Sequence, residues 1–346
     1  MVVFMVDAHC IFYRLYRYRE IASVYTNSRD ELIIDLVVGF FNVLAHYRRF
    51  FARNLRKDND IFCVFNREPT AYHETYQPGF KEKLYKQYDP NDRTYGFVNR
   101  CMVDAWKFIV SMSPYFEGIY CLDNQGIDDH ALIASSKLYN QNNLYVLFSK
   151  TSYTLQLLSD NVVQLYNKRE KSRLITKDTC YSEGVLFGLK TVANNRLTPD
   201  LLPLIWTLAG CPDVSMKKTR QVPNIRYGVK IANTMFAAGD LGSGISIQSF
   251  IDLVREYVRK NGEELIADRE YFLNRHRVLD LQLCAKALTS DQLNNVMAQC
   301  YDVYDQNELE RVNERLAEIT RDGNIISIEK LNMSSAVKAS WDYDDM

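Results

Sequence analysis

The first 66 residues alternate short apolar runs with longer amphipathic ones. Residues 2–6 (VVFMV) are β-branched, aromatic or aliphatic, end at Asp7 and lead into AHCIFYRLYRY, whose apolar spacing is helical. Residues 33–51 repeat the helical spacing and lead to DIFCVFN, which reads as a buried strand ending at Asn66. The pattern predicts a strand–helix unit followed by a second one, with a polar residue at the end of each strand.

The alternation continues to residue 167. Residues 104–113 have helical spacing, GIYCLD reads as a third strand, and DDHALIASSKLY reads as a helix that opens with Asp128 and Asp129. Next come a buried strand (YVLFS), a turn, a short helix and a strand (VVQLYN). Alternating strands and helices predict an α/β fold, a mainly parallel sheet flanked by helices.

Changes in composition predict three regions: an α/β core (1–168), a helical subdomain (169–262) and a mostly helical C-terminal extension (263–346). Within the core, residues 67–97 are rich in Tyr, Lys and Pro and are expected to be irregular or mobile. KREKSRLITKDT is interpreted as a charged connector, and residues 199–250 as short helices between Gly and Pro turns. The chain ends in an acidic aromatic tail, SWDYDDM.

Bulk composition excludes several classes of protein. With 47% hydrophobic residues the chain can fill real cores, and 42 Lys plus Arg against 43 Asp plus Glu limits any nucleic-acid surface to a local patch. The eight cysteines show no CxxC pair, which predicts buried free thiols in a reducing compartment. The most apolar run, residues 32–47, is too short to span a bilayer, and the N-terminus lacks the features of a signal peptide. A cytoplasmic protein without membrane contact is expected.

Five degenerate motifs occur in order within residues 1–245. They are Asp7 with Tyr13-Arg14, Phe65-Asn66, His73-Glu74 with Tyr76 and Phe80-Lys81, Gly126-Ile127-Asp128-Asp129, and SKTSYTLQL at residues 149–157. Their order and spacing resemble the 5′-nuclease superfamily, a PIN-like group that includes flap endonucleases and phage 5′–3′ exonucleases. The resemblance implies a mainly parallel sheet, an arch at residues 67–97 and a helix-turn-helix-type subdomain that grips DNA.

The chain departs from the family pattern at its acidic positions. Where the family carries acids, this sequence has Asn66, Gly126, Thr151, Tyr153 and Cys211, and the alignment of Asp213 with another acid is open. The framework around the fourth strand persists as Ser149, Leu155, Gln156 and Leu157. This selective loss indicates a retained scaffold from which the chemistry has been removed.

The lost acids matter because this chemistry uses carboxylates to hold two divalent metals about 4 Å apart. Asp7, Asn66, Asp128 and Asp129 remain as the remnant of the cluster, and Asp7, Asp128 and Asp129 are the candidate metal ligands. No cofactor is expected to be required, and one weak Mg²⁺ or Mn²⁺ site is the alternative. Each acid taken alone has a simpler explanation, since Asp7 can cap the first helix and Asp128 and Asp129 suit a helix N-terminus.

Binding to DNA does not require catalysis. A local basic cluster spans the helix-turn-helix-like segment and consists of Lys217, Lys218, Arg220, Arg226 and Lys230. A second candidate set lies in the arch and first helix and consists of Arg14, Lys81, Lys83 and Lys86 with Tyr76 and Tyr85. A solvated basic loop and packing tyrosines are the alternative interpretation.

Three hypotheses follow. The first is a catalytically silent 5′-nuclease-like protein, phage-encoded, that binds branched or single-stranded DNA or a replication or transcription partner. The second is a residual metal-dependent 5′ nuclease, and the third is a protein-binding scaffold. The C-terminal region with its acidic aromatic tail is the candidate surface for a protein partner, and a frayed, solubilising end is the alternative.

Overall fold

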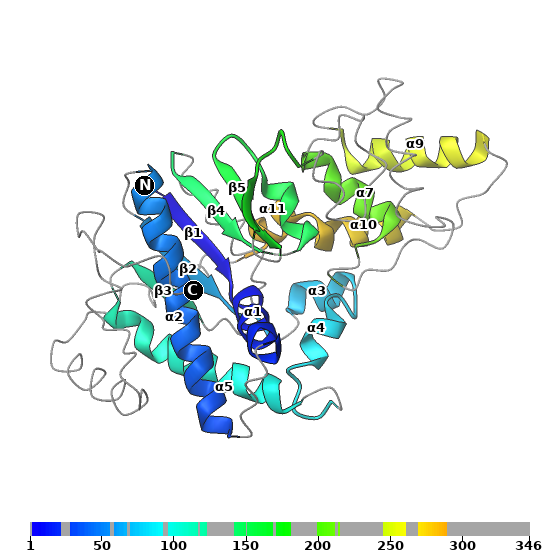
Figure 1. The fold of residues 1–346 in the computed structure, drawn as a ribbon. Helices are drawn as coiled ribbons and strands as arrows, with labels where there is room; N and C mark the ends of the chain where they lie inside the picture. The colour runs from blue at the N-terminus through cyan, green and yellow to red at the C-terminus, as the bar shows by residue number, and fades with distance from the viewer. Residues whose placement is uncertain are drawn as a thin grey trace. The chain divides into compact units, whose positions relative to one another are not determined.

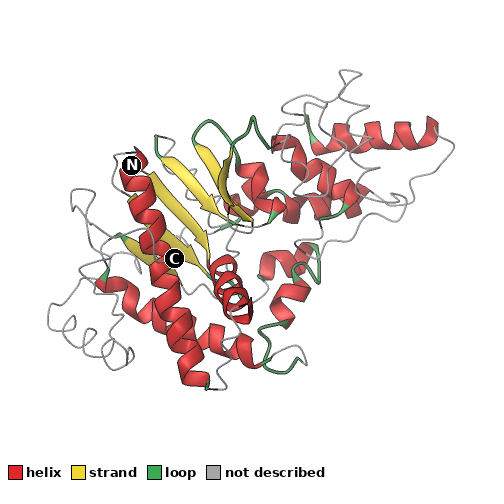
Figure 2. Cartoon of the chain, viewed as in Figure 1, coloured by secondary structure: helices red, strands yellow, loops and turns green. Residues whose placement is uncertain are grey.

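The computed structural model describes residues 2–21, 28–55, 59–67, 70–92, 96–116, 118–122, 142–149, 151–168, 171–180, 199–211, 214, 245–260 and 269–288. These residues divide into two compact units. The first holds residues 2–65 and 96–122, and the second holds the described residues between 66 and 92 and between 142 and 288. Figure 1 labels their elements, and Figure 2 shows that both units mix helices with strands.

The first unit is built on three parallel strands. They are β1 (Val2–Asp7), β2 (Asn59–Val64) and β3 (Ile119–Leu122), in the order β3-β2-β1. β1 and β2 pair so that Asp7 lies opposite Val64, and β2 and β3 pair with Cys63 opposite Cys121. Every residue of β1 is buried, as expected of a strand in a parallel sheet that is covered on both faces.

Helices α1 (Ala8–Ile21), α2 (Arg29–Leu55) and α5 (Phe97–Met112) cover these strands, and the 3-10 turn η1 (Ser113–Tyr115) leads into β3. In the view of Figure 1, α2 runs alongside β1 and passes in front of β2, which it contacts. Phe4 of β1 packs against Phe51 of α2, with ring centroids 4.9 Å apart. Phe12, Phe40 and Trp106 form the aromatic core that joins α1, α2 and α5.

The second unit contains β4 (Leu144–Phe148), β5 (Val162–Lys168) and β6 (Lys171–Ile175). β4 and β5 are parallel and are joined through the 3-10 helix η2 (Ser152–Leu157). β6 pairs antiparallel with β5. The interpretation of this stretch as a connector was therefore wrong. β6 is an edge strand, on which Ile175 is fully buried and Leu174 is 44% exposed. The Lys and Arg residues in this run make it resemble a solvated connector in the sequence.

Short helices complete the second unit. They are α3 (Ala71–Tyr76), α4 (Glu82–Lys86), η4 (Pro199–Leu201), α7 (Leu202–Ala209), α9 (Ile247–Lys260), α10 (Arg269–Leu279) and α11 (Leu281–Lys286). The expectation of an irregular segment at residues 67–97 is corrected by α3 and α4. These helices have six and five residues and bury one residue each, His73 and Tyr85, so they are too short to show a helical period in the sequence. Helices α10 and α11 fall within the predicted C-terminal extension, yet they contact α3, α7 and η2 within this unit.

The predicted α/β class and mainly parallel strands are confirmed. The seven cysteines in the described ranges are free and buried, which also agrees with the sequence. None of the helices in those ranges combines the length and apolarity needed to cross a bilayer.

Candidate functional site

Asp7 lies at the end of β1 and at the start of α1. Its side chain is 4% exposed, and Oδ1 accepts a hydrogen bond of 3.0 Å from the backbone N–H of His9. Its Oδ2 accepts from the Cys10 thiol at 3.3 Å. These contacts are those of a helix-capping carboxylate, so they support the simpler explanation offered by the sequence.

The turn after β4 is where the resemblance places two further acids. Thr151 stands at the first position, and its Oγ1 accepts from the Tyr153 N–H at 2.8 Å, which caps η2. The Thr151 carbonyl accepts from the Thr154 hydroxyl at 3.1 Å. The Thr151 hydroxyl oxygen is therefore already used in organising the local backbone.

Gln164 of β5 closes the polar network beneath this turn. Its Nε2 donates to the Ser149 carbonyl at 2.8 Å and to the Thr151 carbonyl at 3.3 Å. Its Oε1 accepts from the Thr154 hydroxyl at 3.0 Å, and the Gln164 side chain is fully buried. A lone glutamine in the apolar run VVQLYN is the sequence signal from which this buried network could have been predicted.

Tyr153 occupies the second acidic position and is fully buried. Its hydroxyl donates to the Val278 carbonyl at 2.6 Å, near the end of α10. Its ring lies 6.0 Å from Phe80 and 6.2 Å from Trp206, measured between centroids. Tyr153 therefore joins η2 to α7, α10 and the segment before α4.

The residues of this turn do not fit a divalent metal ion. Mg²⁺ and Mn²⁺ require oxygen ligands, preferably charged ones, whereas Thr151 and Tyr153 supply a bonded hydroxyl and a buried ring. Within the described ranges, no group of three or more His, Cys, Asp and Glu side chains is arranged to hold a metal. Asp128, Asp129 and Gly126 lie outside those ranges, as does Asp213.

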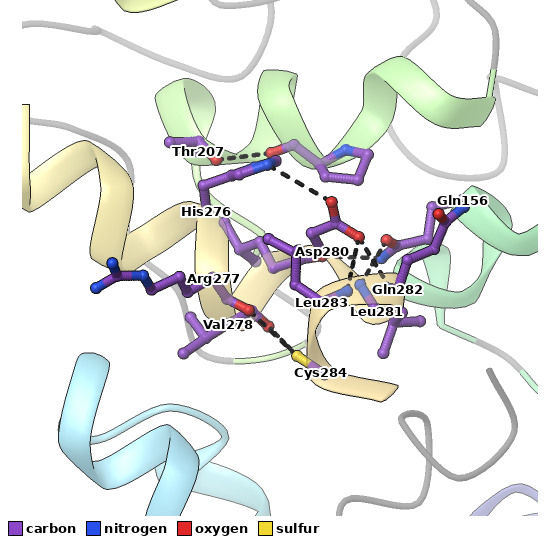
Figure 3. Close-up of polar contacts among 12 residues, drawn as sticks. Gln156, Thr207, His276, Arg277, Val278, Asp280, Leu281, Gln282, Leu283 and Cys284 are labelled. Atoms are coloured by element: carbon purple, nitrogen blue, oxygen red, sulfur yellow. Dashed lines mark hydrogen bonds and ion pairs between the residues drawn. The ribbon is translucent and has the colours of Figure 1, made fainter. Parts of the chain in front are cut away.

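Gln156 fixes the corner between α10 and α11 (Figure 3). Its Nε2 donates to the carbonyls of Tyr153 and Leu279, each at 2.9 Å, and its Oε1 accepts from the Leu281 N–H at 2.9 Å. Gln156 thus satisfies one backbone carbonyl in η2 and two backbone groups at the junction of α10 and α11.

The arch candidates divide into buried and exposed residues. Lys81 is 1% exposed, which corrects the expectation of a surface cation at this position, and Tyr85 is also buried. Lys83, in contrast, is exposed to solvent. Tyr76 is half-buried beneath the guanidinium of Arg277, which lies 4.6 Å from its ring centroid.

Of the remaining basic candidates, the structure describes Arg14 but not the helix-turn-helix-like cluster. Arg14 is half-buried, and its Nη1 donates to the Tyr47 hydroxyl at 3.0 Å, so its guanidinium helps to join α1 to α2. The helix-turn-helix-like cluster lies outside the described residues: Lys217, Lys218, Arg220, Arg226 and Lys230.

His276 gives the second unit a predictable pH dependence. Burial lowers its pKa, against the smaller opposing effect of Asp280, whose carboxylate lies 3.5 Å from Nε2 (Figure 3). The unfolded chain then binds more protons than the folded one, so the free energy of unfolding should fall as the pH drops below about 6.5. Urea titrations between pH 7 and 5 should show this loss, and His276→Gln should reduce the slope. Equal slopes in the two proteins would contradict the assignment.

Comparison with solved structures places this geometry in a known fold. A phage T5 5′-exonuclease with bound zinc aligns with a TM-score of 0.56 and 12% identity over 86% of this chain and 97% of that one. A bacteriophage T5 flap endonuclease variant, described as a pseudo-enzyme–product complex with DNA and metal ions, aligns with a TM-score of 0.54 and 12% identity over 93% and 100%. The chain has the fold of the phage T5 5′ nucleases. No protein-family model and no curated protein sequence matches it.

The 5′-nuclease fold agrees with the architecture implied by the five motifs. At 12% identity the likeness shows the fold and leaves the chemistry to this chain's own residues. At the turn after β4, Thr151 and Tyr153 form structural contacts.

Proposed function

We propose that the chain is a 5′-nuclease-like protein that binds DNA without cleaving it. The observation that carries the proposal is the fully buried Tyr153, whose hydroxyl bonds to Val278 at a position where the resemblance places a metal-binding acid. Hydrolysis by two metal ions needs carboxylates that can hold both, and this turn contributes none.

DNA binding is supported by the fold and by local charge. One solved neighbour is a complex with DNA, and this chain carries an exposed Lys83 in the segment that resembles the arch. The basic residues at positions 217–230 add charge in the segment that resembles the helix-turn-helix. Each phosphate neutralised by such a group contributes salt-sensitive affinity.

The absence of cleavage is tested with fluorescent flap, nicked and single-stranded DNA, incubated with and without Mg²⁺ and then run on a denaturing gel. Intact DNA is expected in every lane, alongside measurable binding by anisotropy. Mg²⁺-dependent cutting that Asp128→Asn abolishes would establish the residual nuclease instead.

The location of the binding surface is tested by reversing charge at Lys217→Glu with Lys218→Glu. Removing two phosphate contacts is expected to weaken binding by roughly tenfold or more and to reduce the salt slope by about 2. Lys107→Glu with Lys260→Glu is the matched control, because both side chains are exposed and net charge changes equally. If both double variants bind DNA with the wild-type affinity, Lys217 and Lys218 are not part of the DNA-binding surface. If the wild type does not bind DNA at all, the proposed DNA binding is wrong and the search moves to protein partners.

A further inference from the structure

Lys81 is the feature of the second unit that the proposed function does not use. It is 1% exposed, and it is the one residue other than glycine with a positive φ, 54°, within the described ranges. Long charged side chains are almost never buried to this degree without a role for the charge. A non-glycine residue in the left-handed region also requires the surrounding structure to hold it there.

The surroundings of Lys81 hold its backbone firmly. Its N–H donates to the Val214 carbonyl at 2.9 Å, and its own carbonyl accepts from Leu84 at 2.8 Å and from Tyr85 at 3.1 Å. Lys81 is thus the residue before α4, with its main chain tied to a segment more than 130 positions away. This arrangement aims the side chain into the unit.

The Lys81 ammonium lies between two aromatic rings. Nζ is 5.9 Å from the centroid of Phe80 and 5.9 Å from that of Tyr153. The two rings meet at 65°, so each can present electron density to the cation. One of these rings belongs to the residue that stands in place of a metal-binding acid.

We propose that Lys81 supplies an internal cation at the turn after β4 and that its contact with Tyr153 fastens residues 70–92 to this turn without a metal ion. The turn fails to fit a divalent cation, and a protein-borne ammonium lies beside it. The positive charge beside this turn then comes from a side chain and does not require a bound ion. This role is independent of DNA binding, because it concerns how the second unit holds itself together.

The first test measures the reactivity of individual lysines. The folded protein is acylated with an N-hydroxysuccinimide ester in EDTA and, separately, in Mg²⁺, and the sites are quantified by mass spectrometry. Lys81 should react at least about tenfold more slowly than the exposed Lys83, with the same ratio in both buffers. Tyr153→Phe should retain the protection. Fast labelling of Lys81 in the folded chain, or protection that appears only with Mg²⁺, would overturn the proposal.

The second test is a double-mutant cycle that asks whether the charge faces position 153. Tyr153→Asp places a carboxylate there, and Lys81 can compensate it. Combining this change with Lys81→Met should raise the unfolding equilibrium constant about tenfold beyond the product of the two single effects. Tyr153→Asn is the neutral control and should show no such coupling.

The single variant Lys81→Met cannot show whether the Lys81 charge acts at position 153, because replacing a buried charge by a similar apolar group can leave stability unchanged. If the cycle shows the same coupling for Tyr153→Asp and Tyr153→Asn, the ammonium does not act at this position and the proposal fails. If the aspartate variants do not fold, the labelling ratio decides, since it uses the wild type and Tyr153→Phe alone.

Discussion

Tyr153→Ala is expected to lower the free energy of unfolding by about 3–5 kcal/mol, as removal of a fully buried aromatic side chain does. The ring fills the space between Phe80 and Trp206, and its hydroxyl bonds to Val278. Truncation leaves a cavity among these groups and removes the hydroxyl donor from the Val278 carbonyl, which keeps only the weak contact of 3.6 Å from the Cys284 thiol. Urea unfolding followed by circular dichroism measures the loss.

Tyr153→Phe is the matched control for the hydroxyl. It keeps the ring and removes only the donor to the Val278 carbonyl, so a loss of about 1–2 kcal/mol is expected. The difference between the two variants isolates ring packing. If the free energy of unfolding of Tyr153→Ala is within about 1 kcal/mol of the wild-type value, the Tyr153 ring does not join η2 to the helices around it.

The strands and the fold class were predictable because they depend on local pattern. The apolar runs around Phe4, Phe62 and Val146 each became a strand within a few residues of the expected bounds. Asp7 was likewise predictable as the polar residue that ends β1, and its capping contact is the alternative that the sequence offered beside a remnant metal ligand. Near-neighbour geometry suffices for such inferences.

The roles of Tyr153 and Lys81 were not predictable in this way. The Tyr153 hydroxyl donates to the carbonyl of Val278, which is 125 residues further along the chain, and the Lys81 N–H donates to the carbonyl of Val214, which is 133 residues further along. No local pattern encodes such a pairing, so the sequence showed only that an acid was missing and a basic residue was present. The missed strand β6 has a different cause, since charged residues on an edge strand resemble a solvated connector.

The interpretation of the turn after β4 therefore differs between the sequence and the structure. The motif resembles a site without its acids, whereas in the structure Thr151 and Tyr153 make hydrogen bonds that hold the neighbouring segments together. Gln164 bonds the two carbonyls of the turn, and Thr151 caps the helix that follows. Reintroducing acids here would compete with these contacts, so the proposal that the chain does not cleave DNA rests on packing as well as on charge.

Gln156→Glu is expected to destabilise the chain by about 3 kcal/mol or more at pH 7, although the two side chains have nearly the same shape. Gln156 donates from one nitrogen to the Tyr153 and Leu279 carbonyls, and only 6% of the residue is exposed. A carboxylate would set negative oxygens against both carbonyls while keeping the acceptor for the Leu281 N–H. The measurement is the free energy of unfolding in urea at pH 7.

The same variant should recover stability as the pH falls, and this recovery identifies the donor as the essential group. Once protonated, the introduced carboxyl can again donate to a carbonyl, so the folded state raises its pKa above the unfolded value of about 4.3. Stability contributed by such a group is present below the unfolded pKa and is lost as the pH rises through the folded one. Gln156→Met, which lacks both donor and charge, provides the baseline for general acid destabilisation. The difference in the free energy of unfolding between Gln156→Glu and Gln156→Met should become smaller from pH 7 to pH 5. If the two free energies change in parallel with pH, the Gln156 nitrogen does not hold the α10–α11 corner.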